Sequence, residues 1–75
     1  MLPKKLYVNT ELLEEKISNS IVPISEIVSN LGISRQAFAK KRKGLIPFRA
    51  SEVYVLCDLL HISEEERIKI FYPKS

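Results

Sequence analysis

The 75-residue sequence contains no tryptophan, one cysteine, one histidine and two glycines. A single cysteine cannot form a disulfide within the chain, so we expect a protein of the reducing cytoplasm and not a secreted, disulfide-stabilised scaffold. The two glycines do not form a glycine-rich phosphate-binding loop. His61 has no second ligand at metal-binding spacing, and Cys57 lies in an apolar segment typical of a core residue. We therefore expect no metal site, no cofactor and no enzymatic activity.

Long apolar runs are also missing from the sequence. The longest one, from Val53 to Cys57, is far too short to span a membrane, so we expect no membrane association. The first eight residues contain Lys4 and Lys5 but no apolar segment behind them, which argues against a signal peptide. The length fits one small domain, near the lower limit for a self-sufficient hydrophobic core.

Acidic residues are absent between Ser34 and Ser51, although the net charge of the whole chain is only +3. This stretch holds six basic residues, which are Arg35, Lys40, Lys41, Arg42, Lys43 and Arg49. The rest of the chain has six basic and nine acidic residues, a net charge of −3. One basic block on an otherwise acidic domain is typical of nucleic-acid binders. A basic run by itself is about as often a solvated helix face as a binding surface.

The same region has the pattern of two short helices joined by a turn. Apolar residues recur at i, i+3, i+4 and i+7, at Ile24, Ile27, Val28 and Leu31. Gly32 follows and can end this helix in the left-handed conformation. Ser34 can then cap a second helix, over about residues 34–43, whose apolar stripe is Phe38 with Ala37 and the stem of Lys41. The pattern predicts a helix-turn-helix with a polar and basic outer face.

The run Leu31-Gly32-Ile33-Ser34-Arg35, with Phe38 three residues on and Gly44 closing it, resembles the helix-turn-helix of Cro-like phage repressors. The likeness covers roughly residues 10 to 72. The flanking phrases are also similar to those of small Cro-like phage regulators: Pro47-Phe48 leading into Glu52-Val53-Tyr54, and Ile70-Phe71-Tyr72. The resemblance implies an all-α fold of the lambda repressor type, a compact bundle of about five short helices. Residues 1–75 would form one domain, in which residues 1–8 are an arm that lies on the domain, reaches along DNA or is disordered.

The remaining segments predict three further helices. They run from Asn9 or Thr10 to about Asn19, from about Ala50 to His61, and from a capping box of Ser63 and Glu66 to a point before Pro73. The expected core residues are Leu12 or Leu13, Ile17, Val53, Leu56, Leu59 or Leu60, Ile62, Ile68 and Phe71. The run Val53-Tyr54-Val55 also has strand propensity, and a β-hairpin there would give an excisionase-like winged helix. No hairpin turn follows it, so we favour a helix.

The resemblance also assigns roles to the second helix of the motif. It places base contacts on Arg35, Gln36 and Lys40. From the chemistry of the residues we also expect a base contact by Ala39 and phosphate contacts by Ser34, Lys41, Arg42, Lys43 and Arg49. Arginine can donate two hydrogen bonds to guanine, the glutamine amide can pair with adenine, and a small alanine lets the helix approach a thymine methyl group. Two simpler explanations stay open: a surface ion pair between Arg35 and Glu26, and capping alone for Ser34.

The function expected from these features is a sequence-specific transcriptional regulator that binds double-stranded DNA, as a homodimer on an inverted repeat. One domain with three base-reading side chains contacts too few base pairs for useful specificity. The alternative is an antirepressor-like module that binds a regulatory protein partner, in which the basic helix meets an acidic protein surface.

Overall fold

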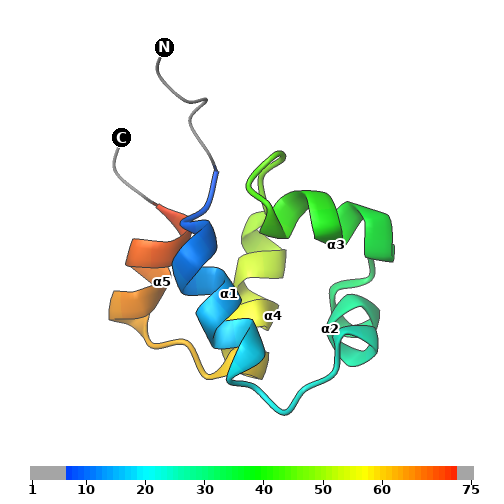
Figure 1. Ribbon diagram of the computed structural model, residues 1–75, viewed down its shortest axis with the longest axis horizontal. Coiled ribbons are helices and arrows are strands. Elements are labelled where there is room, and N and C mark those ends of the chain that lie inside the picture. The colour runs from blue at the N-terminus through cyan, green and yellow to red at the C-terminus, as the bar shows by residue number, and fades with distance from the viewer. Residues whose placement is uncertain (1–6, 73–75) are drawn as a thin grey trace.

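The computed structural model describes residues 7–72, which form five helices and no strand. The helices are α1 (Thr10–Ser18), α2 (Ile24–Leu31), α3 (Arg35–Arg42), α4 (Ala50–Leu60) and α5 (Glu64–Phe71). Figure 1 shows α4 near the centre, with α1 and α5 on one side and α2 and α3 on the other. The predicted all-α bundle of short helices is confirmed. The hairpin alternative is wrong, because Val53-Tyr54-Val55 lies within α4.

Side-chain caps fix where three of the helices begin. Asn9 Oδ1 accepts a hydrogen bond from the backbone N–H of Leu12 at 3.2 Å, at the start of α1. Ser34 Oγ accepts one from Ala37 at 3.0 Å, at the start of α3. At α5, Ser63 Oγ and Glu66 Oε1 each accept from the other residue's backbone N–H, at 3.2 and 2.9 Å. These bonds satisfy N–H groups that have no partner within the helix, as the sequence predicts.

Two residues with positive φ end helices α2 and α4. Gly32 (φ 70°) ends α2 as predicted, and the turn from Gly32 to Ser34 leads into α3. His61 (φ 55°) ends α4 one residue earlier than expected. Among residues 7–72, His61 is the one non-glycine residue in this region, where Cβ crowds the following carbonyl oxygen.

The core forms where α2 packs against α4 and α3, and α1 packs against α5 and α3. Its members are Val8, Leu13, Ile17, Ile27, Phe38, Val53, Leu56, Leu60, Ile62, Ile70 and Phe71. Most of the predicted core residues are among them, but Ile68 is not, since its exposed fraction is 50%. The capping box starts α5 so that Ile70 and Phe71 face inward, which places Ile68 on the outer side.

The chain before α1 is held by the loop after α3 and by the end of α5. The Tyr7 N–H donates to the Gly44 carbonyl at 3.2 Å, and the Asn9 N–H donates to the Ile70 carbonyl at 2.7 Å. Val8, between them, is buried in the core. Val8, at the end of the expected arm, therefore lies within the domain, and residues 1–6 of that arm lie outside the described part of the chain.

Replacing His61 by glycine tests the backbone strain at the end of α4. We predict that His61→Gly raises the free energy of unfolding by about 0.5–1 kcal/mol, because glycine adopts positive φ without a Cβ clash. Urea denaturation followed by circular dichroism measures this change. His61→Ala keeps the Cβ and should bring no gain. An equal gain from alanine would show that the imidazole ring, and not the backbone, limits stability.

Candidate nucleic-acid interface

The outer face of α3 exposes the polar side chains that the sequence singles out. Gln36, Lys40 and Lys43 follow one another at i, i+4 and i+7 and are exposed. Arg35 is exposed beside them, and it forms no ion pair with any of residues 7–72, so the alternative pair with Glu26 is not formed. The opposite face of α3 is anchored in the core by Phe38. The predicted base-contact residues therefore share an accessible surface with no acidic side chain among them.

Two smaller predicted residues lie on or next to this face. Ala39 is half-buried between the exposed polar side chains and the bundle, so no long side chain separates the backbone of α3 from an approaching ligand. Ser34 is exposed, and its hydroxyl oxygen accepts the capping hydrogen bond from Ala37. Capping fully explains the presence of Ser34, and its hydroxyl hydrogen remains free to donate to an anion.

Lys41 does not belong to the exposed face. Only 8% of the surface of Lys41 is exposed. Its Nζ donates to Oε1 of Glu52 on α4, and Glu52 is itself only 4% exposed. The predicted phosphate contact by Lys41 is therefore corrected: its ammonium group is buried and already neutralised by a carboxylate. The sequence held one hint of this, since Lys41 lies three residues after Phe38 on the same side of the helix.

The carboxylate that accepts from Lys41 also caps the next helix. Glu52 Oε1 accepts a second hydrogen bond, from the backbone N–H of Arg49 at 2.8 Å. Burial alone would raise the pKa of Glu52, but the hydrogen bonds from Lys41 and Arg49 outweigh it and hold this pKa below its ordinary value. Glu52 therefore stays ionised and joins the end of α3 to the beginning of α4.

Arg42 is occupied by a second ion pair, with α1. Its Nε and one terminal nitrogen donate to the two carboxylate oxygens of Glu14, each at 2.8 Å. This two-point pair lowers the pKa of Glu14 and raises that of Arg42. The guanidinium also lies over the ring of Phe38, 5.4 Å from its centroid. The charge of Arg42 is therefore already balanced by Glu14, so Arg42 adds less than a free cation to the attraction for phosphates.

The loop 43–49 carries one more exposed cation beyond the end of α3. The chain turns at Gly44 (φ 79°), whose N–H donates to the Lys41 carbonyl at 3.0 Å. Phe48 anchors the loop by packing its ring edge-on against Phe38 and Phe71, with centroids 6.3 and 5.5 Å apart. Arg49 is exposed immediately before α4. Lys43 and Arg49 thus flank the loop as accessible positive charges.

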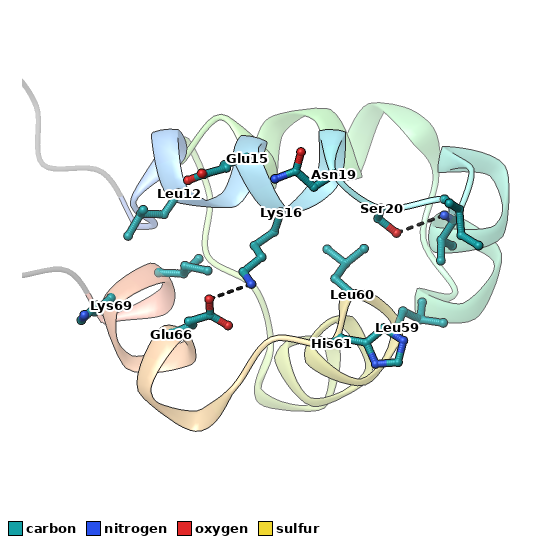
Figure 2. A pocket seen from close by; sticks show the side chains of 13 residues that line it. Leu12, Glu15, Lys16, Asn19, Ser20, Leu59, Leu60, His61, Glu66 and Lys69 are labelled. Atoms are coloured by element: carbon teal, nitrogen blue, oxygen red, sulfur yellow. Dashed lines mark hydrogen bonds and ion pairs between the residues drawn. The ribbon is translucent and has the colours of Figure 1, made fainter.

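A groove of about 690 Å³ lies elsewhere, between α1, the end of α4 and α5. Figure 2 shows the ion pair that crosses it, from Lys16 to Glu66 at 2.7 Å. The hydrogen bonds from Lys16 and from Ser63 lower the pKa of Glu66 to about 2. None of the predicted DNA-contact residues lines this groove.

Comparisons of the chain with protein-family models, with curated proteins and with solved structures gave no match. In the described part of the chain, no helix is long and apolar enough to cross a membrane. No three His, Cys, Asp or Glu side chains of residues 7–72 lie where they would share a metal ion.

Removing a buried and an exposed lysine should have very different effects. We predict that Lys41→Ala lowers the free energy of unfolding by about 3–5 kcal/mol, because the Glu52 carboxylate is left buried without a counter-charge. Lys43→Ala should change it by less than about 0.5 kcal/mol. Urea denaturation of both variants measures the difference. The double change Lys41→Met with Glu52→Gln should recover most of the loss, and equal losses in the two single variants would contradict the burial of this pair.

Acid should destabilise the fold through its paired carboxylates. The pKa values of Glu14, Glu52 and Glu66 are lowered from 4.5 in the folded state, so the unfolded chain takes up protons first as the pH falls. We predict that the urea midpoint falls as the pH drops below 4.5 towards 2. Glu66→Gln keeps the capping acceptor but cannot titrate, so its curve should be flatter. Glu65→Gln, outside the ion pairs, should follow the wild type.

Proposed function

We propose that the chain is a sequence-specific transcriptional regulator of the cytoplasm, which binds double-stranded DNA with α3 in the major groove and acts as a homodimer. With its side chains, an α-helix is about 10–12 Å in diameter. The major groove of B-form DNA is about 12 Å wide, so it admits a helix of this size. The exposed position of Arg35, Gln36 and Lys40 at one side of α3 is compatible with base contacts in such a groove.

The observation that supports the proposal most is the division of the basic run 40–43. Lys41 and Arg42 are neutralised by carboxylates from α4 and α1. Lys40 and Lys43 point outward and, like Arg35 and Arg49, form no ion pair with residues 7–72. Exposed cations without an ion-pair partner, on and just after one helix, repel each other, and a polyanion relieves that repulsion.

Each exposed side chain has a proposed role that follows from its chemistry. Arg35 and Gln36 offer paired hydrogen-bond donors and acceptors to purine edges, and Lys40 reaches a third base. Ala39 permits close approach and contact with a thymine methyl group. Ser34, Lys43 and Arg49 contact phosphates, which fixes the orientation of the domain on the duplex and not the sequence it prefers. Pairing of two copies on half-sites about one helical turn apart would supply the remaining specificity.

The division between base and phosphate contacts gives the test of the proposal. We predict that Arg35→Ala weakens binding to a duplex selected from a random pool by about 1–3 kcal/mol and blurs its preference at one position. Lys43→Ala should weaken binding to selected and random duplexes alike and reduce the slope of log affinity against log salt by about 1. Mobility-shift titrations over a range of salt concentrations measure both effects.

Lys69→Ala is the matched control, because it removes the same charge from α5, at the groove shown in Figure 2. Its affinity should stay within about twofold of the wild type. Equal effects of Arg35→Ala and Lys43→Ala on both duplexes would overturn the assigned roles. Failure to bind any duplex at low salt would overturn DNA binding and favour the antirepressor-like alternative, in which α3 meets an acidic protein.

A further inference from the structure

A second surface with exposed aromatic side chains lies at a groove that α4 and α5 line together. Tyr54 on α4 is 78% exposed, and Tyr72 at the end of α5 is 60% exposed. Both tyrosines border one groove of about 670 Å³, which begins at Ala50 and also includes Cys57. Tyrosine rings combine a large apolar area with a polar tip and few rotatable bonds, and they are enriched in protein interfaces.

The walls of this groove carry charges of both signs. Asp58 on α4 and Glu64 on α5 supply carboxylates, and Arg67 on α5 supplies a guanidinium. Arg67 lies over the ring of Tyr72, 5.8 Å from its centroid, and its contact with Glu64 is long, at 3.7 Å. Asp58 forms no ion pair with residues 7–72. The groove therefore offers an aromatic rim, one unpaired carboxylate and one loosely held cation.

We propose that this α4–α5 groove, bordered by Tyr54 and Tyr72, is the surface on which a second copy of the chain docks. The inference rests on the proposed function, which needs two copies on one duplex. A two-fold interface places the same patch on both sides, so the patch must be complementary to itself. Acidic and basic side chains in one groove meet that condition, because a half-turn brings Arg67 of one copy towards the carboxylates of the other.

The position of the groove next to the loop 43–49 points to the same occupant. Its first residue, Ala50, directly follows the loop 43–49 that carries Lys43 and Arg49. Two copies that meet at this groove bring their Arg49 side chains, which are proposed to contact phosphates, close to the shared interface. A common duplex can then be contacted by both, as half-sites one turn apart require.

The competing surface is the groove shown in Figure 2, where Ile21 is 98% exposed at the rim. Ile21 belongs to the segment between α1 and α2, which Figure 1 shows at the end of the molecule opposite α3. Copies that paired through Ile21 would hold their α3 helices far apart. Tyr54 in the α4–α5 groove and Ile21 at the competing surface are therefore matched positions at which to test the two interfaces.

Tyr54→Glu and Ile21→Glu each replace an exposed apolar side chain by a carboxylate and should leave the fold intact, which melting curves verify. We predict that Tyr54→Glu weakens pairing of copies about tenfold or more, because it buries a charge beside Asp58. Ile21→Glu should change pairing by less than about twofold. Sedimentation equilibrium of the protein alone, and of its complex with the selected duplex, gives the stoichiometry and the pairing constant.

Cys57 provides a second readout, because it is the only thiol of the chain and lines the same groove. Burial raises the pKa of this thiol, so its alkylation by iodoacetamide is followed at alkaline pH. The rate should fall as the protein concentration rises, and this protection should be lost in Tyr54→Glu. A rate independent of concentration, in a sample that sedimentation shows to be paired, would overturn the assignment of this surface.

The outcomes also separate this inference from the proposed function. A duplex complex with one copy, or a pairing loss in Ile21→Glu or in neither variant, would overturn the α4–α5 interface while DNA binding stands. Absence of any duplex binding would overturn the proposed function, and sedimentation of the protein alone would still decide whether Tyr54 lies in an interface. Selective loss of pairing in Tyr54→Glu supports the inference.

Discussion

The buried ion pair between Lys41 and Glu52 is the constraint on which the arrangement of α3 depends. Moving a carboxylate and an ammonium group out of water costs several kcal/mol for each ion, so the pair is tolerated only when both partners are well matched. Glu52 meets this condition with one oxygen, which accepts from Lys41 and from the N–H of Arg49. Among the described residues, no buried side-chain nitrogen or oxygen lacks a partner. A rotation of α3 about its axis would break this balance, so the pair admits a single orientation of the helix.

That orientation decides which charges of the basic run remain available. Lys41 pairs with α4 and Arg42 pairs with α1, so the two ion pairs fix the end of α3 against both helices. Lys40 and Lys43 must then point to solvent, because consecutive helical residues are about 100° apart. The accessible charge is therefore smaller than the sequence count suggests, and within the run 40–43 it lies on the side of the helix opposite the two ion pairs.

The local signals in the sequence predict the helices but do not predict the ion pairs. Capping by Asn9, Ser34 and Ser63 depends on neighbours within three residues, so the sequence alone reveals it. The partners of Lys41 and Arg42 lie 11 and 28 residues away, and only the packing of α3 against α4 and α1 brings them together. The expected burial of Ile68 is wrong for a different reason. Ile68 and Ile70 are equally apolar, and only the rotation of α5 about its axis decides which of them faces the core.

The hydrogen bonds of Tyr7 and Asn9 have a consequence for how the chain acquires its structure. The N–H of Asn9 donates to the carbonyl of Ile70, and Val8 packs in the core beside it. The start of α1 is therefore positioned by contacts with α5. Contacts between segments so distant in sequence form only after a large loop closes, which slows folding relative to the local helices. During synthesis, residues 7–9 therefore cannot form their native contacts until α5 has left the ribosome.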